Sequence, residues 1–194
     1  STGEWRVRQK AQDKKSIFGK IISIDKLKNM DNYNIISMGH RNPQGLYYSK
    51  EDDLIISTEH GPVGGDEINI NLNPSSKNIK NYGWPISSYG KHYIDNDSLK
   101  KFAPLHKSHT KFGFIEPLRY YSPAIAPTEI TKIPKNFNKE FVNDYLVTTL
   151  GYPYKTGGEF SLIHIRLDSE NNKIIYHQTI DIDERIRDID FLIK

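Results

Sequence analysis

The sequence carries three blocks rich in glycine, proline and asparagine: GHRNPQGL at residues 39–46, EHGPVGGDEIN at residues 59–69 and NYGWP at residues 81–85. Glycine permits backbone angles that other residues avoid, and proline fixes its own backbone, so such blocks form tight turns. Each block lies next to short runs rich in β-branched and aromatic residues. The pattern predicts strands joined by rigid loops, and it makes these loops the candidate functional segments.

The rest of the sequence also favours strands over helices. Runs of four to eight residues with strand-forming character occupy residues 19–24, 34–38, 54–58, 68–72, 145–149, 160–167, 174–180 and 186–193. There is no apolar stripe of four helical turns; residues 139–147 come nearest, and they fit equally well a turn that leads into a strand. We therefore predict an all-β chain with little helix.

Strands at this spacing are typical of a sandwich, a barrel or the blades of a β-propeller. A blade takes roughly 40 to 45 residues, so a chain of this length would supply about four blades. No sequence repeat with that period is present. The residue pattern alone leaves the three architectures open.

The composition fits a single soluble domain of 194 residues. Its 27 basic and 24 acidic residues are interspersed and give a net charge of +3, which does not indicate a nucleic acid partner. The absence of cysteine excludes a disulfide framework, a thiolate nucleophile and Cys-ligated zinc, and it suits an oxidising compartment as well as the cytoplasm. No stretch approaches about 18 apolar residues and the first residues are polar, so we expect neither a membrane span nor a signal peptide in this chain.

In their order and spacing, the three blocks resemble the central signature of the soluble PQQ-dependent sugar dehydrogenases, the glucose/sorbosone dehydrogenase family. Further similarity lies at residues 11–13, 19–21, 121–127 and 184–188, so the resemblance covers nearly the whole chain. It implies that residues 1–194 form one partial domain, about four blades from the C-terminal part of a six-bladed β-propeller. The missing blades, or a second copy of the chain as a homodimer, are then expected partners.

The resemblance also implies an activity. Members of this family oxidise the C1 hydroxyl of aldose sugars to lactones with pyrroloquinoline quinone (PQQ) and calcium, and pass the electrons to an acceptor that this sequence does not identify. It implies a periplasmic or secreted location.

Four residues of the cofactor site follow from matching positions. Arg41 resembles the arginine that donates to the reactive quinone oxygen, and Asn42 matches a second PQQ contact. Arg185 and Arg187 are two apart in a strand-like run, so both project from one face and could bind a pair of carboxylates; the alternative is a solvated pair that balances nearby acidic residues. Lys155 is a weak substitute for a PQQ-contacting lysine of the family.

The metal sites follow in the same way. Gly61 and Pro62 resemble the positions whose backbone carbonyls hold the calcium ion beside PQQ. Glu67, with the carbonyl of Tyr82, matches a second, structural calcium site, the alternative being a plain carboxylate at a strand end. Tyr82 and Trp84 are interpreted as core residues and not as sugar contacts.

The catalytic base of the family, a histidine, lies upstream of all these blocks, and His40 is interpreted as structural. No residue of this chain is assigned as the base. Two hypotheses follow: a part of a PQQ enzyme, or a noncatalytic propeller-type binding module. A glycoside hydrolase is less favoured because the carboxylates show no recognisable pairing.

Overall fold

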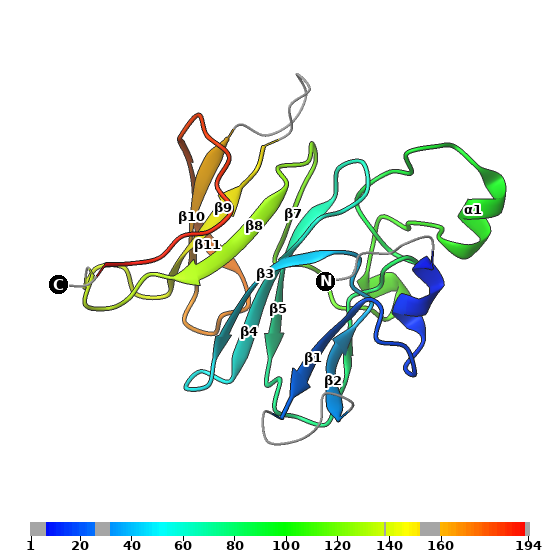
Figure 1. Cartoon of the computed structure of the whole chain (residues 1–194), viewed down its shortest axis with the longest axis horizontal. Coiled ribbons are helices and arrows are strands. Elements are labelled where there is room, and N and C mark those ends of the chain that lie inside the picture. The colour runs from blue at the N-terminus through cyan, green and yellow to red at the C-terminus, as the bar shows by residue number, and fades with distance from the viewer. Residues whose placement is uncertain (1–6, 26–31, 138, 152–159, 193–194) are drawn as a thin grey trace.

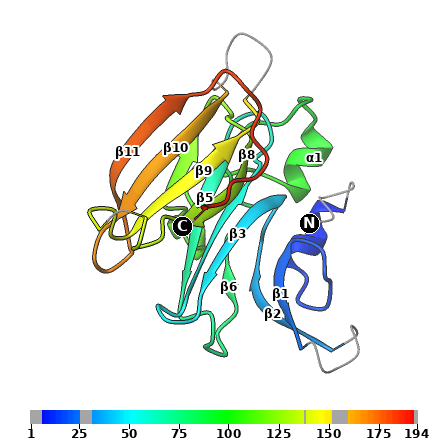
Figure 2. The ribbon, with the colours of Figure 1, turned by 60° about the vertical axis from the view of Figure 1, so that its left-hand side comes forward.

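The structure, a computed structural model, describes residues 7–25, 32–137, 139–151 and 160–192. Within these ranges the chain forms strands in three sheets, together with one short α-helix and two 3-10 turns. The three sheets fan out side by side along the molecule (Figures 1 and 2). The prediction of an all-β chain with little helix is confirmed.

The first sheet has three strands in the order β1-β2-β6. Strand β1 pairs antiparallel with β2, whereas β6 joins β2 in parallel. These strands span Lys20–Ile24 (β1), Tyr33–Met38 (β2) and Lys80–Asn81 (β6).

The second and third sheets each have four antiparallel strands. The second sheet has the order β3-β4-β5-β7 and consists of Pro43–Ser49 (β3), Leu54–Glu59 (β4), Asp66–Leu72 (β5) and Arg119–Tyr121 (β7). The third has the order β11-β10-β9-β8 and consists of Pro127–Lys132 (β8), Asp144–Thr149 (β9), Ser161–Leu167 (β10) and Ile174–Asp181 (β11). Four-stranded sheets of this kind, placed side by side, are the blades of a propeller.

The main core lies between the second and third sheets. All six residues of β4 are buried, and β10 alternates between buried and half-buried positions, as expected where one face of a strand meets a neighbouring sheet. The buried apolar side chains that meet there are Leu54, Ile56, Ile68, Ile70, Tyr121, Ile125, Ile130, Tyr145, Val147, Ile163, Ile165 and Leu167. Burial of each aliphatic side chain in this set contributes about 1.5 to 3 kcal/mol. The core therefore fixes the second and third sheets relative to each other.

A long excursion separates β6 from β7. Residues 82–118 contain the α-helix Asp97–Phe102 (α1), capped by the Asn96 side chain, and the 3-10 turn Thr110–Phe112. Because this segment forms no sheet of its own, the described residues make three sheets, where blade length alone suggested about four. No helix in the described ranges is long and apolar enough to cross a membrane.

Most of the predicted strands are present, and 139–147 forms a turn that leads into β9. The strand predicted at 186–193 is wrong over the described residues 186–192. There only Ile186 bonds to neighbouring strands: its amide donates to the Thr149 carbonyl, and its carbonyl accepts from Thr128 Oγ1. Its acidic and basic side chains stay exposed instead of entering a sheet. Strands β7 and β8 escaped the sequence analysis because both lie in a segment rich in proline and polar residues.

Candidate functional site

The three glycine-rich blocks meet at one end of the second sheet. In the second sheet, Pro43 lies opposite Glu59, and Glu59 lies opposite Glu67. The start of β3, the end of β4 and the start of β5 therefore lie side by side. The third sheet presents its corresponding end next to them: His60 Nε2 donates to the carbonyl of Pro127, at the start of β8, over 2.9 Å. The site therefore lies where loops from two sheets converge.

Arg41 is held in this site by contacts from several directions. Its backbone N–H donates to Glu59 Oε2 over 2.8 Å, and its guanidinium Nη1 donates to the carbonyl of His60 over 2.8 Å. The guanidinium lies 5.5 Å from the ring centre of Trp84, in the range of a cation–π contact. Asn42 is half-buried beside it, and its carbonyl accepts from the His60 N–H over 3.1 Å. Both residues thus have fixed positions beside the loop that begins at His60.

His40 fits the structural interpretation. It is buried, with Nε2 hydrogen-bonded to Ser37 Oγ at 2.7 Å and Nδ1 to Glu59 Oε1 at 3.2 Å. Its ring stacks on Tyr82 with 4.7 Å between ring centres. Tyr82 and Trp84 are buried as well, as expected for core residues.

Two carboxylates, Glu59 and Glu67, lie buried next to each other. The Asn69 side-chain amide donates to both of them, over 2.7 Å to Glu59 and 3.1 Å to Glu67. Burial and the nearby charge of Glu59 raise the pKa of Glu67 well above its usual range. Burial acts to raise the pKa of Glu59 too, but the charge and hydrogen bond of His40 and the Arg41 amide hold that pKa below its usual value. Glu59 thus favours its ionised form, whereas Glu67 favours its protonated form as long as no cation lies beside it.

Further polar atoms in the cluster have no hydrogen-bond partner. These are Asn69 Oδ1 and both ring nitrogens of His109, all buried. The His109 nitrogens lie 3.6 Å from Glu67 Oε1 and 3.5 Å from Glu116 Oε2, too far for good hydrogen bonds. Burial lowers the pKa of His109 and so favours its neutral form. An unpartnered acceptor beside two carboxylates fits a cation.

A small pocket borders this cluster. It has a volume of about 10 Å³, room for one water molecule or ion. Residues from all three blocks line it, among them Arg41, Gly61, Glu67, Tyr82 and Trp84. In the described part of the chain, no three His, Asp or Glu side chains are arranged to hold a metal. An ion in this pocket would therefore need backbone carbonyls as ligands, which calcium accepts readily.

Gly61 is suited to such a role. A Cβ atom added there would lie 2.2 Å from the carbonyl oxygen of Gly65 and 2.4 Å from that of Gly64, so only glycine fits. Pro62, buried next to it, fixes the local backbone. The chain thus brings several carbonyl groups close together at this loop.

The two C-terminal arginines approach the same end of the third sheet. Between them, Ile186 is half-buried; its N–H donates to the Thr149 carbonyl over 3.0 Å, and its carbonyl accepts from Thr128 Oγ1 over 2.7 Å. Arg185 and Arg187 are exposed on either side. Residues 184–188 form no strand, so the projection from one face that a strand-like run predicts does not apply here, and the assignment of both arginines stays a prediction. Lys155 lies outside the described residues.

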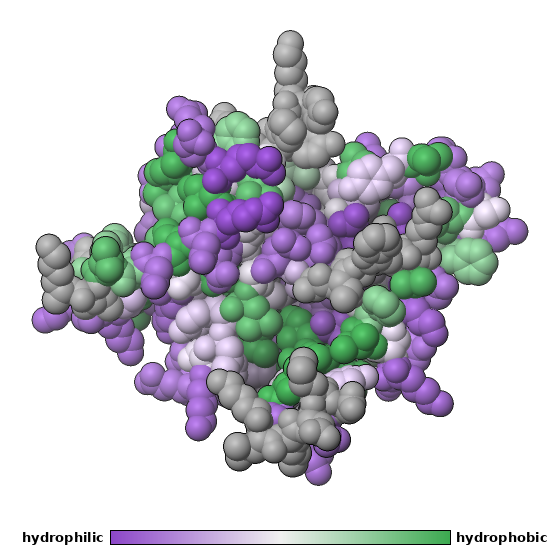
Figure 3. Space-filling view, viewed as in Figure 1, coloured by the Kyte–Doolittle hydropathy of each residue, from purple (hydrophilic) through white to green (hydrophobic). Residues whose placement is uncertain are grey.

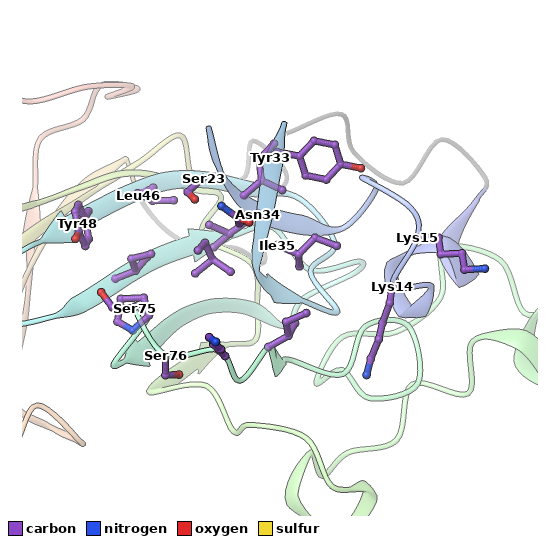
Figure 4. Close-up of a pocket in the computed structure, with 17 residues that line it drawn as sticks. Lys14, Lys15, Ser23, Tyr33, Asn34, Ile35, Leu46, Tyr48, Ser75 and Ser76 are labelled. Carbon is purple, nitrogen blue, oxygen red and sulfur yellow. The ribbon is translucent and has the colours of Figure 1, made fainter. Parts of the chain in front are cut away.

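A larger cavity lies elsewhere, against the first sheet and the outer part of β3 and β4. It has a volume of about 980 Å³, and Figure 4 shows Ile35 and Leu46 among its lining side chains together with Lys14 and Lys15. The hydrophobic side chains exposed in the lower half of Figure 3 lie in the same region of the molecule. None of the predicted site residues lines this cavity. We therefore locate the candidate site at the small polar pocket and not at the large apolar one.

Four residues of this cluster were not predicted from the sequence: Glu59, Asp66, Asn69 and His109. The first three belong to the quoted block 59–69, so their place in a glycine-rich loop was a usable signal. His109 lies in the irregular segment between β6 and β7, and nothing in its neighbours indicates that it reaches Glu67.

Comparisons with known proteins bear on this site. The model of the family described as Glucose / Sorbosone dehydrogenase matches residues 1–191. The chain is 34% identical over 194 residues to the uncharacterised protein slr1608 of Synechocystis, covering 94% of this chain and 42% of that protein. It is 33% identical over 137 residues to the aldose sugar dehydrogenase YliI of Escherichia coli, covering 64% of this chain and 34% of that protein. A shorter match of 51 residues, 45% identical, covers 26% of this chain and 9% of quinoprotein glucose dehydrogenase B of Acinetobacter calcoaceticus.

A solved structure of a glucose dehydrogenase superposes on this chain with a TM-score of 0.73 and 27% identity. The superposition covers 95% of this chain and 52% of that one. The chain thus spans about half the length, or less, of the proteins that it matches.

Proposed function

The chain belongs to the Glucose / Sorbosone dehydrogenase family, and we propose that it forms the cofactor-binding part of a sugar dehydrogenase that uses PQQ and calcium. When bound, PQQ would supply the two-electron acceptor: C1 of the aldose would give up its hydride and the C1 hydroxyl its proton, and C1 would become the lactone carbonyl. The family match and the sugar dehydrogenases among the similar proteins support the class of reaction. The quinoprotein relative supports the choice of cofactor.

Arg41 is the proposed catalytic residue. Its guanidinium is anchored by the His60 carbonyl and lies over Trp84, so the cation is held without the need to reorganise during the reaction. We assign it to the quinone oxygen on which negative charge develops, where a preorganised donor stabilises the transition state. Asn42, fixed beside it, is assigned as a second PQQ contact.

The remaining PQQ contacts are assigned to the C-terminal arginines. PQQ carries three carboxylates, and guanidinium groups bind carboxylates through paired hydrogen bonds. Arg185 and Arg187 are exposed at the end of the third sheet that adjoins the pocket, so they are free to meet such a ligand. Lys155 remains a weaker assignment.

Calcium is assigned to the carbonyls of Gly61 and Pro62, and a second calcium ion to Glu67 with the carbonyl of Tyr82. A cation here would stabilise the ionised form of Glu67, which burial and the Glu59 charge otherwise disfavour, and the unpartnered Asn69 oxygen also fits the second ion. Neutral carbonyl ligands beside a carboxylate are typical of calcium and disfavour softer metals.

The observation that carries the proposal is that Arg41, Gly61 and Glu67, from two separate blocks, line one pocket. Titration of PQQ into this chain should show weak binding with calcium and none with EDTA. The chain alone should not oxidise sugars with a dye acceptor, because no residue in it is assigned as the base. A form extended upstream should bind PQQ more tightly and oxidise an aldose.

In that extended form, Arg41→Ala should lower kcat about 100-fold, the cost of one oxyanion donor. Arg8→Ala is a matched control, because Arg8 also lies over Trp84, at 5.6 Å, but outside the pocket. Unchanged turnover in Arg41→Ala would remove Arg41 from the mechanism. A folded extended form that neither binds PQQ nor oxidises an aldose would make the chain part of a noncatalytic binding module instead.

We further propose a periplasmic or secreted location and an external electron acceptor. We also propose that the first sheet offers a surface for a partner, either further blades or a second copy of the chain. The three strands of that sheet, against four in each of the others, support this surface.

A further inference from the structure

Asp66 links the loops of two different sheets with one carboxylate. It is the first residue of β5 and is only 2% exposed. Its Oδ1 accepts from the Gly61 N–H over 2.8 Å, and its Oδ2 accepts from the N–H groups of Ile125 and Ala126 over 2.9 and 2.8 Å. Gly61 belongs to the second sheet's loop, whereas Ile125 and Ala126 lead into the third sheet. Hydrogen bonds to an ionised acceptor are roughly twice as strong as neutral ones.

The contact to Gly61 acts on the peptide group that also binds Arg41. That peptide joins His60 to Gly61: its N–H donates to Asp66, and its carbonyl accepts from Arg41 Nη1 over 2.8 Å. Because a peptide group is planar, fixing its N–H also fixes the direction of its carbonyl. Asp66 and Arg41 therefore hold opposite sides of one rigid unit.

A second hydrogen bond connects the His60–Gly61 segment to the third sheet. The His60 side chain donates to the Pro127 carbonyl, one residue beyond the Ala126 amide that Asp66 binds. Ala126 has a φ of 49°, in the left-handed region that a residue with a side chain rarely adopts. Its carbonyl accepts from Leu150 N–H over 2.9 Å, so contacts on both sides hold this unusual turn. Without Asp66, two backbone donors of that turn would lose their acceptor.

We propose that Asp66 is a positioning residue for Arg41: it orients the His60–Gly61 peptide on which the guanidinium rests and holds that peptide against the third sheet. The assignment rests on the proposed function only for what Arg41 then does to PQQ. The contacts that Asp66 makes are independent of any ligand.

The first test replaces Asp66 with Asn in this chain. Asparagine keeps the shape, but its NH₂ group must face at least one of the three N–H donors. The amide oxygen keeps more hydrogen bonds when it faces Ile125 and Ala126, so the NH₂ group should face Gly61. Amide hydrogen exchange at Gly61 should then rise about tenfold or more, in line with the loss of one hydrogen bond to a charged group. Asp144→Asn is the matched control, because Asp144 is also fully buried but lies at the opposite end of β9 from Thr149. It should leave exchange at those three amides unchanged.

A reciprocal variant keeps the proposal testable if Asp66→Asn does not fold. Arg41→Ala removes the hydrogen bond to the carbonyl of the His60–Gly61 peptide. Amide exchange at Gly61 should therefore rise, while exchange at Ile125 and Ala126 stays near the wild-type value. Unchanged exchange at Gly61 in Arg41→Ala, or in a folded Asp66→Asn, would overturn the proposal.

The link to function is tested by a double-mutant cycle on PQQ affinity. If Asp66 acts through Arg41, each single variant should weaken binding about tenfold, and the double variant little more than Arg41→Ala alone. Independent, multiplying losses would overturn the positioning role even if the exchange result holds. A wild-type chain that binds no PQQ would instead count against the proposed function, and the exchange measurements would then decide on Asp66 alone.

Discussion

Two buried acidic sites, one in each four-stranded sheet, differ in how their charge is balanced. In the third sheet, Asp144 is fully buried and accepts from Arg166 Nε over 2.5 Å and from Arg166 Nη2 over 3.0 Å. His164 Nε2 lies 2.6 Å from the same carboxylate. Every oxygen of Asp144 thus has a strong partner, and the guanidinium supplies a full positive charge.

In the second sheet, Glu59 and Glu67 share the amide of Asn69 and have His40 as the group that offsets their charge. The Asn69 oxygen and the nitrogens of His109 remain without hydrogen bonds. A buried carboxylate without a full counter-charge is costly. The comparison indicates that the Asp144 site is complete in itself and serves stability, whereas the Glu59–Glu67 site is suited to an ion from solution.

The largest expected effect comes from removing the Asp144 carboxylate, whose charge is fully balanced. Asp144→Ala leaves Arg166 and His164 without their partner and should lower the free energy of unfolding by about 3 kcal/mol, whether or not calcium is present. This is the low end for a buried pair, because the Arg166 side chain is 37% exposed. Urea denaturation measures the loss. Asp181→Ala, at an exposed aspartate on β11, should change stability by no more than about 0.5 kcal/mol. A loss below about 1 kcal/mol for Asp144→Ala would contradict the structural role.

Glu67→Gln tests the incomplete site. Without calcium, the glutamine variant should be at least as stable as the wild type, because its neutral amide resembles the protonated carboxyl that burial and the Glu59 charge favour. With calcium at about 100 times its dissociation constant, the wild type should gain about 2.7 kcal/mol and the variant much less. Thermal unfolding in calcium and in EDTA measures the difference. Glu129→Gln, at a half-buried carboxylate on β8, should keep the full calcium response. An equal calcium response in Glu67→Gln would show that the ion does not use this carboxylate.

The smallest effect concerns His177, a half-buried neighbour of Tyr121 whose Nε2 lies 3.2 Å from the tyrosine hydroxyl. Burial and the charge of Arg119 lower its pKa, so the folded protein resists protonation while the unfolded chain takes up a proton near pH 6.5. The stability that the neutral histidine provides is therefore full above about pH 6.5 and is lost as the pH falls below it.

His177→Gln should flatten this pH dependence by about 0.5 kcal/mol between pH 7.5 and 5.5, a small value because solvent screens the side chain. Urea titrations at the two pH values measure it. Identical slopes for wild type and variant would remove His177 from the pH response.

Sequence patterns predicted much of the fold because they act over short distances. The runs that form β4, β5, β9 and β10 were recognisable since strand-forming residues alternate or cluster within a few positions. The blocks at 39–46 and 59–69 were recognisable because glycine and proline restrict the local backbone. Strand β8 was missed because its proline and polar residues resemble a loop, and tertiary packing against β3 decides its conformation.

The sequence by itself determined the strand-rich class, the family, and the loops that carry Arg41, Gly61 and Pro62. Only the tertiary structure decided which groups meet there. Asp66 reaches the Ala126 amide across 60 positions, and His109 lies beside Glu67 only because the segment before β7 folds back over the second sheet. Such contacts carry no local pattern, since a hydrogen bond between distant residues depends on how two sheets pack and not on the order of neighbouring side chains. For the same reason, the opposite pKa shifts of Glu59 and Glu67 become visible only when their burial and neighbours are known.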